Sequence, residues 1–333
     1  MKQAFFIFYL LFGFLAFGQD LHLSQFYTNQ MNLNPAMASR YDGAYRFAGN
    51  YRNQWREIGK PLATMFLALD KKIYFFSDEI DLGVMFNEDQ FSGFNQKTNK
   101  IMLNGVYTKR ISTHKISAGL QLGVVLKSTD LSMQTFPNQW VYETGEFNSD
   151  VSNGESSMVE NQTFFDANFG IVWSKKFNKM TPKVGFSLFH FNRPKATYFN
   201  EFTERLRARK TFSAELDWEI KEDVSLEPKL LYMWTTKSQD LVFGTNLKKH
   251  LDSEIVRNVF AGILMRTGVG RNNDAVIPVV GMGIKRFDIG FSYDVNISTL
   301  SYYNSKKSSL ELSVIYTPPM YNPTKLSIPC DRY

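Results

Sequence analysis

Residues 287–297 read Phe287-Asp288-Ile289-Gly290-Phe291-Ser292-Tyr293-Asp294-Val295-Asn296-Ile297, with apolar residues at the odd positions and polar or small residues at the even ones. Successive side chains of a β-strand point to opposite faces, so this stretch has one apolar and one polar face. The apolar face is rich in aromatic residues. This pattern, repeated along a chain, favours a transmembrane β-barrel over a soluble sandwich.

The same alternation recurs almost to the C-terminus and predicts fourteen strands. They lie at residues 44–52, 62–71, 80–87, 97–111, 115–129, 163–177, 181–192, 208–220, 224–234, 240–247, 256–267, 274–285, 287–297 and 310–317. An even strand number suits a single-chain bacterial barrel. Residues 44–317 are therefore predicted to form one all-β domain, a transmembrane antiparallel β-barrel of about 14 strands. Pro228 interrupts one strand and predicts a bulge or a frayed segment, because proline cannot donate to a ladder.

The connections between these strands predict an orientation. If the N-terminus is periplasmic, the connections after odd-numbered strands face outward. The two longest, residues 130–162 and 193–207, both fall in that set, whereas the connections after even-numbered strands are mostly tight. Outer-membrane barrels have short periplasmic turns and longer outer loops, so strand count and orientation support each other.

Charged and amide side chains on the polar faces are expected to point into the lumen, because a charge facing lipid costs several kcal/mol. They can line a pore, cross-link the interior or hold a plug, and we expect a structural role for most. The predicted set is Arg46, Arg52, Asp166, Asn168, Glu215, Asp217, Glu219, Glu227, Lys229, Asp288, Asp294 and Glu311.

The first eighteen residues have the features of a cleaved signal peptide. Lys2 precedes an apolar run at residues 5–17, and Ala16-Phe17-Gly18 supplies small residues at the cleavage positions. We therefore predict a signal peptide at residues 1–18, and export to the bacterial outer membrane. No other window approaches eighteen apolar residues, which excludes a helical membrane protein.

Composition agrees with a barrel. The mean hydropathy is slightly negative at −0.27, yet aromatic residues make up 15% of the chain. Lys and Arg are scattered, so the basic pI of about 9.1 predicts contact with acidic lipid or glycolipid head groups and not with nucleic acid. The single cysteine, Cys330, allows no internal disulfide; we expect a free thiol, with a bond to another chain as the alternative.

Residues 19–43 precede the first strand and are too long and too apolar for a bare tail. Ser24 can cap a short helix that Asn34-Pro35 would end. We expect this segment to pack inside or beneath the barrel as a plug; a partly ordered periplasmic segment is the alternative. Residues 318–333 are predicted to form a C-terminal periplasmic tail.

Several motifs together resemble the PorP/SprF family, and they cover the mature chain in the expected order. They are Ser24-Gln25-Phe26-Tyr27, Asn32-Leu33-Asn34-Pro35-Ala36, Tyr51-Arg52-Asn53-Gln54-Trp55, Phe165-Asp166-Ala167-Asn168-Phe169-Gly170, Ser292-Tyr293-Asp294-Val295-Asn296 with Ser298-Thr299-Leu300, and Pro329-Cys330-Asp331-Arg332-Tyr333. The last differs from the family's closing C-P-R-F at Asp331 and Tyr333. As plug and family motif positions we single out Asn34, Pro35, Ala36, Arg52 and Trp55.

The resemblance implies an outer-membrane barrel associated with type IX secretion and gliding motility. Some members of the family belong to the core machinery, and many others are partners of secreted adhesins. Neither the choice between these roles nor the identity of a secreted partner follows from the sequence.

The outer connections are the expected docking surface for such a partner, because the lumen of a barrel this size cannot pass a folded protein. The longest connection carries Phe136, Trp140, Tyr142 and Phe147 among polar residues, which suits recognition. A lid over the barrel mouth is the alternative for this loop. The basic connection near residues 193–210 predicts contact with anionic glycolipid, or with an acidic partner.

No catalytic, metal or cofactor motif was found. The four histidines lack metal-ligand spacing, and His190 is interpreted as a girdle residue at a strand end. We therefore expect a non-enzymatic protein without a cofactor. Two rivals stay open: a channel for small solutes or hydrophobic ligands, like the fatty-acid transporters, and a barrel hydrolase. A continuous apolar pocket beneath the plug would favour the channel, and an acid/base cluster at the barrel lip would favour the hydrolase.

Overall fold

A computed structural model describes residues 23–38, 40–54, 61–75, 78–92, 95–130, 134–152, 154, 161–196, 205–236, 238–269, 273–298 and 307–320. The predicted signal peptide, Trp55 and residues 321–333 with Cys330 lie outside the described residues.

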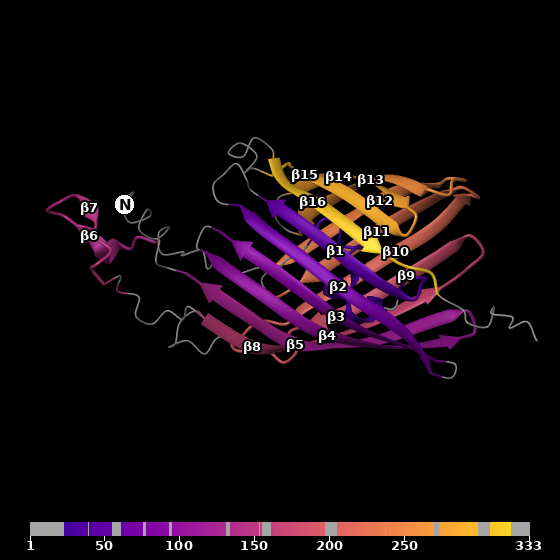
Figure 1. Cartoon of the computed structure of the whole chain (residues 1–333), viewed down its shortest axis with the longest axis horizontal. Coiled ribbons are helices and arrows are strands. Elements are labelled where there is room, and N and C mark those ends of the chain that lie inside the picture. Colours follow the sequence, from indigo (N-terminus) through magenta and orange to yellow (C-terminus); the bar gives the residue numbers. More distant parts are fainter. Residues whose placement is uncertain are drawn as a thin grey trace, which may run out of the picture.

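Fourteen strands close into one antiparallel barrel, as predicted, in which β1 pairs with β16 to complete the ring (Figure 1). The strands tilt across the long axis of the barrel. They are β1 (Tyr45–Gln54), β2 (Leu62–Phe75), β3 (Asp78–Phe91), β4 (Gln96–Ile111), β5 (His114–Thr129), β8 (Asn161–Lys175), β9 (Met180–Phe189), β10 (Arg209–Lys221), β11 (Val224–Trp234), β12 (Gln239–His250), β13 (Val256–Gly268), β14 (Asn273–Ile284), β15 (Phe287–Asn296) and β16 (Lys307–Tyr316).

The alternation at residues 287–297 places apolar side chains on the outer face of β15 and polar side chains on its inner face. Phe287 and Phe291 are 44% and 41% exposed on the outer surface, whereas Ser292 and Asp294 are fully buried. A strand whose apolar face points outward needs hydrocarbon rather than water around it, which is the condition that a transmembrane barrel meets. Among the described residues, no helix has the length and apolar character needed to cross a bilayer.

Strands β2 and β3 extend further than the apolar alternation predicted. The prediction ended the first at residue 71 and began the second at residue 80, but pairing continues to Phe75 and Asp78. Lys72 pairs with Asp81 in this extension. Backbone hydrogen bonds do not require apolar side chains, so the ladder runs past the apolar band.

The two ends of the barrel differ as predicted. One end carries the turns between β2 and β3, β4 and β5, β8 and β9, β10 and β11, β12 and β13, and β14 and β15. We call it the short-turn end. The other end carries the connections between β5 and β8 and between β9 and β10, which are the longest in the barrel, and we call it the long-connection end.

Pro228 was predicted to mark a bulge or a frayed segment, and the structure has a local gap in one ladder at this position without a bulge. It pairs in register with Thr245 of β12, but the β10–β11 ladder lacks two consecutive pairs, Leu216 with Pro228 and Asp217 with Glu227, and then resumes in the same register. Proline has no N–H to give to β10, and an antiparallel residue bonds one neighbour at a time, so the loss stays local. The bulge in β10 lies instead between Glu219 and Lys221.

The inner wall is polar on one side and apolar on the other. Most of the charges predicted for the lumen are buried there, but Asp217, Glu219 and Asp288 lie near the short-turn end and reach solvent. On β11–β14 the inner wall also carries apolar side chains, which the sequence did not predict. These side chains form an apolar patch, which we call the inner patch: Leu231, Met233, Val242, Leu264, Ala275, Ile277 and Val279.

A small hairpin lies beyond the long-connection end, between β5 and β8. It consists of the 3-10 helix η2 (Pro137–Gln139) and the strands β6 (Trp140–Val141) and β7 (Glu146–Phe147), and Figure 1 shows it away from the barrel. The short helices α2 (Gln30–Leu33) and η1 (Pro35–Met37) belong to the segment before β1.

Candidate functional site

The segment before β1, described at residues 23–38 and 40–43, lies inside the barrel, and we call it the inner segment. Leu23, Phe26, Met31 and Ala36 are buried, at no more than 3% exposure. The segment bonds to inward-facing side chains of strands on opposite sides of the ring, including Glu311 of β16 and Ser187 of β9. A chain that meets the inner faces of strands around a closed ring occupies its lumen.

Ser24 and Gln25 attach the segment to two buried carboxylates. The backbone N–H groups of both residues donate to Glu311, at 2.7 and 3.0 Å. The Ser24 hydroxyl donates to Asp294 Oδ1 at 2.7 Å, and the Gln25 amide donates to Ser292 Oγ at 3.1 Å. Four strands therefore hold two consecutive residues, because β15 and β16 contribute the acceptors and Arg52 of β1 and Arg266 of β13 also donate to Ser24 Oγ.

Two arginines balance these carboxylates. Arg52 lies 3.0 Å from Asp294 and 3.4 Å from Glu311, and Arg266 of β13 lies 2.8 Å from Asp294. We call Arg52, Arg266, Asp294 and Glu311 the charge cluster; its members are at most 7% exposed. A buried charge without a partner is costly, so two cations and two anions with shared hydrogen bonds keep each charge compensated.

Asn34, Pro35 and Ala36 fit against glycines of the opposite wall. The Asn34 amide donates to the carbonyl oxygens of Ile171 and Phe186, each at 3.1 Å. A β-carbon on Gly119 would lie 2.5 Å from Ala36 N. Inward-facing glycines thus create the space that the segment fills, and any larger residue there meets its backbone.

Further glycines and amides continue this contact. A β-carbon on Gly170 would lie 1.9 Å from Asn34 Oδ1, and one on Gly185 would lie 3.0 Å from Asn34 Nδ2. A β-carbon on Gly83 would require the end of the Met31 side chain to move. Asn104 donates to the carbonyl of Pro35 at 3.1 Å. The glycines in these strands are therefore positions of close approach rather than weak points of the wall.

The inner segment passes from the long-connection end to the short-turn end. The charge cluster that holds Ser24 lies toward the long-connection end, near the last residues of β1, β13 and β15. Arg40, further along, forms an ion pair of 2.7 Å with Glu215 of β10. Burial lowers the pKa of Arg40, but the Glu215 carboxylate more than offsets this and the pKa lies above its ordinary value.

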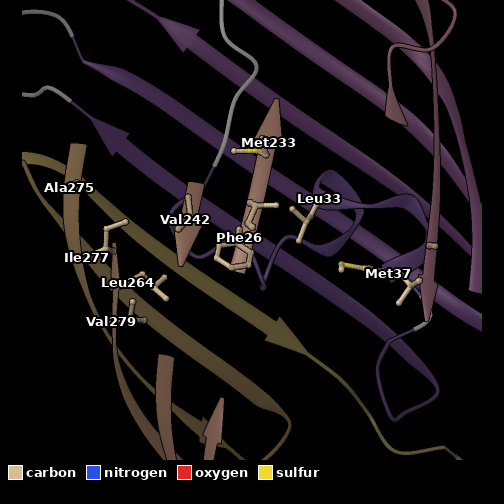
Figure 2. Close-up of a cluster of buried hydrophobic side chains, with 12 residues drawn as sticks. Phe26, Leu33, Met37, Met233, Val242, Leu264, Ala275, Ile277 and Val279 are labelled. Atoms are coloured by element: carbon tan, nitrogen blue, oxygen red, sulfur yellow. The ribbon is translucent and has the colours of Figure 1, made fainter. Parts of the chain in front are cut away.

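Apolar side chains of the segment cover the inner patch. Phe26, Leu33 and Met37 form one buried cluster with it, and Figure 2 shows Phe26 and Leu33 among the side chains of the wall. The patch is apolar because the segment, and not water, lies against it.

Two cavities lie beside the segment. One, of about 20 Å³, lies near Leu23 and Met233 and has room for a single water. The other, of about 170 Å³, has room for several waters or a small molecule, and it lies beside Tyr27. Its lining mixes polar side chains (Glu227, Asn246 and Lys248 among them) with apolar ones (Phe260, Ile289 and Ile315), so it is not a continuous apolar pocket.

His190 is not the girdle residue that the sequence suggested. It is 2% exposed, its Nδ1 lies 2.7 Å from Asp166, and its backbone N–H donates to Asn168 at 2.8 Å. A positive φ of 55° at His190 ends the β9 alternation and turns the side chain from the outer surface to the interior. Its partner Asp166 belongs to the family-like motif at residues 165–170, but the distance between the two residues in the sequence did not indicate that their side chains would pair.

The aromatic residues of the longest connection lie on the hairpin beyond the barrel. Residues 134–152 form what we call the hairpin loop. Trp140 and Phe147 pair edge to face at 4.9 Å, and Tyr142 is 88% exposed at the tip. The loop is held from within, since buried Gln139 accepts from Phe136 N and donates to Val151 O.

The structure thus brings together one group of predicted residues and separates another. Asn34, Pro35, Ala36 and Arg52 all touch or belong to the inner segment, whereas Trp55 lies outside the described residues. Phe136, Trp140, Tyr142 and Phe147 belong to the hairpin loop. Glu311 was predicted only as a lumen-facing charge, and Arg266 was not predicted at all. Within the described part of the chain, no cluster of His, Cys, Asp and Glu could hold a metal ion.

The amino-acid sequence matches one family of known proteins over most of its length. A family model described as type IX secretion system membrane protein PorP/SprF matches residues 15–316. No curated protein matches the chain.

Two solved structures share the fold. The toluene transporter TbuX of Ralstonia pickettii is 9% identical, with a TM-score of 0.51 over 88% of this chain and 94% of its own. The monoaromatic hydrocarbon channel CymD is 10% identical, with a TM-score of 0.52 over 89% and 93%. At this identity the likeness concerns the barrel alone.

Proposed function

The chain belongs to the PorP/SprF family of type IX secretion system membrane proteins of the bacterial outer membrane, and from this premise we propose that it is a non-enzymatic barrel that supports the secretion or surface attachment of an adhesin-like protein. Its role in gliding motility is part of the same proposal. The observation that carries it is the filled lumen.

The filled lumen favours docking over passage. The inner segment is bound at the charge cluster and at the glycines of the opposite wall, and the cavities of about 20 and 170 Å³ beside it are far too small for a folded protein. We assign to this segment the role of a plug. A secreted protein would therefore meet this barrel at its surface and leave the cell by another route.

The hairpin loop suits the docking of such a protein. It is folded by its own hydrogen bonds, so little conformational entropy is lost when a partner binds. Trp140, Tyr142 and Phe147 present large, stiff aromatic surfaces, the residue types that dominate binding energy at interfaces. Its position beyond the barrel end favours a docking arm over a lid.

The charged residues of the hairpin loop are all acidic. Residues 134–152 contain Glu143, Glu146 and Asp150 and no basic residue. A partner surface with basic residues around an apolar centre would complement it.

A hydrophobic-ligand channel is the second candidate, and the inner patch is the observation that favours it. Phe26, Leu33 and Met37 cover the patch, however, and the larger cavity has charged and amide groups among its apolar lining residues. The barrel likeness to TbuX and CymD carries no ligand with it at 9–10% identity. Release of the plug would be needed before a ligand could reach the patch.

The test is a deletion in the native bacterium with measurement of the secreted and surface-attached proteins. The wild-type gene and a Trp140→Ala/Tyr142→Ala/Phe147→Ala variant are then reintroduced, with Thr144→Ala/Ser149→Ala, at exposed uncharged positions of the same loop, as the control. We expect loss of one surface protein on deletion, rescue by wild type and control, and failure of the aromatic variant despite normal barrel levels.

The outcomes separate the parts of the proposal. An unchanged set of secreted and surface proteins after deletion would contradict the function. Rescue by the aromatic variant would contradict docking at the hairpin loop only. Loss of every type IX substrate, rather than one, would assign the chain to the core machinery.

A further inference from the structure

The connection between β9 and β10 carries a cluster of exposed cations. Arg193, Lys195 and Arg205 are exposed, and the backbones of Lys195 and Arg205 pair in an antiparallel bridge. The guanidinium of Arg205 donates to the carbonyl oxygen of Arg193 at 3.1 Å, which brings the third cation beside the other two. We call these three residues the basic strap.

Backbone hydrogen bonds give the strap a defined conformation. His190 and Arg193 adopt positive φ values of 55° and 46°, and Arg193 N donates to His190 O at 2.9 Å, so the chain turns sharply after β9. Leu206 N then donates to Pro194 O at 2.8 Å. These bonds hold both branches of the connection together at its base and keep the cations close.

No acidic side chain offsets the strap in the part of the chain that the structure describes. Among the described residues, Arg193, Lys195 and Arg205 form no ion pair. The sequence at residues 193–210 has six basic and two acidic residues, a net charge of +4. Cations on one side of a membrane surface repel each other unless an anion lies between them.

The outer wall beneath the strap marks the level of the membrane interface. Tyr232 and Trp234 stack at 5.0 Å, and Trp234 lies 6.1 Å from Phe186 on the same surface. Aromatic girdles of this kind sit at the lipid head groups.

Lys210 lies in that girdle. It pairs in register with Trp234 of β11 and is exposed, and Phe212, two positions further on the same face, is 38% exposed toward the lipid. A cation at this level reaches the phosphates of the bilayer while its alkyl stem stays among apolar groups.

We propose that the basic strap and Lys210 bind the phosphate groups of an anionic glycolipid, of the lipid A class, in the outer leaflet. Arg and Lys are suited to phosphate, and the girdle places the site where the acyl chains of such a lipid lie against the outer face of β9–β11.

A lipid fits this position better than an acidic protein. The aromatic and apolar wall continues directly from Lys210 into the membrane-facing surface, so an occupant must offer both phosphate and hydrocarbon. An acidic protein segment would meet the cations from the water side only. The site does not depend on which secreted protein the barrel serves.

The test measures lipid binding to the purified mature barrel in detergent by native mass spectrometry. The probes are diphosphoryl lipid A and the same lipid without phosphate. The variant is Arg193→Ser/Lys195→Ser/Arg205→Ser, and the control is Lys176→Ser/Lys179→Ser/Lys221→Ser, which makes the same charge change near the short-turn end.

We expect wild type and control to bind diphosphoryl lipid A and the strap variant to bind it about a hundredfold more weakly, since each basic residue at an anionic surface contributes about a factor of five. Binding by wild type should also weaken as salt rises, which tests the charge contribution without any mutation.

Three outcomes overturn the proposal. They are equal binding of the lipid with and without phosphate, an equal loss in the control variant, and binding of polyglutamate in place of lipid A by wild type. The last would assign the strap to an acidic protein partner. Barrel integrity is checked by the circular dichroism of each variant, and if the strap variant is unfolded the salt dependence of wild type decides.

Discussion

Ser24 and Glu311 lie 287 positions apart in the sequence, and the Ser24 amide donates to the Glu311 carboxylate at 2.7 Å. Glu311 lies in the last strand and pairs in register with Arg52 of the first. The inner segment therefore reaches its full set of contacts only when β16 has closed on β1, so barrel closure and docking of the segment are coupled.

Glu311→Ala should destabilise this junction. It removes the acceptor of the Ser24 and Gln25 amides and leaves Arg52 short of one partner, at a cost of about 3–5 kcal/mol for a broken buried pair. Unfolding in urea, followed by the gel mobility of the folded barrel, measures the change. Glu219→Ala, at an exposed position, is the control and should stay within about 0.5 kcal/mol. Equal stability of both variants would mean that the charge cluster does not hold the segment.

Gly119→Ala should force the segment away from the wall. The added methyl group would lie 2.5 Å from Ala36 N, and overpacking of this kind costs about 1–3 kcal/mol. Gly105→Ala is the matched control in the neighbouring strand, because its β-carbon would meet only Leu82 at 3.9 Å. A cysteine introduced at Ala36 should react faster with a water-soluble thiol reagent in the first variant than in the second. Identical labelling rates would refute the close contact.

Deletion of residues 24–36 should open the barrel to ions. The segment leaves cavities of about 20 and 170 Å³, and its removal exposes the polar side of the lumen to water. Single-channel recording in planar bilayers is expected to show a low conductance for the full mature chain and a clearly higher one for the deletion. A full chain that already conducts like the deletion would rule out a plug.

Gln139→Ala should loosen the hairpin loop without affecting the barrel. The buried amide side chain joins Phe136 and Val151, and an unsatisfied partner costs about 1–3 kcal/mol. Limited proteolysis should cut within residues 134–152 sooner in this variant, while barrel unfolding stays unchanged. Thr144→Ala, at an exposed position of the same loop, is the control. Equally fast cleavage of the two variants would show that Gln139 does not hold the loop.

Arg40→Ala should cost more than the double change Arg40→Ala/Glu215→Ala. Arg40 holds Glu215 through two hydrogen bonds, of 2.7 and 3.4 Å, inside the barrel. The single variant leaves a buried carboxylate uncompensated, at about 3–5 kcal/mol, and removal of both partners relieves it. Unfolding midpoints of the two variants and of Glu215→Ala complete the cycle. Strictly additive effects would contradict a direct pair.

The family-like motifs were informative because many of their residues meet at the inner segment. Ser24 and Gln25 bind Asp294 and Ser292, and Gly170 accommodates Asn34. The alternation showed that Asp294 faces inward, but not that its partners would be Ser24, Arg52 and Arg266. His190 shows the limit most clearly, since a left-handed backbone angle reversed the side predicted for its side chain.

The sequence alone determined the barrel, the number of its strands and the face of most side chains. These follow from a period of two, which each strand carries locally and which lipid outside and polar groups inside enforce. Only the tertiary structure decided how the lumen is filled, which glycines are contact points and where the hairpin loop folds. Such features depend on residues such as Ser24 and Glu311 that meet through ring closure, and no local pattern encodes the distance between them.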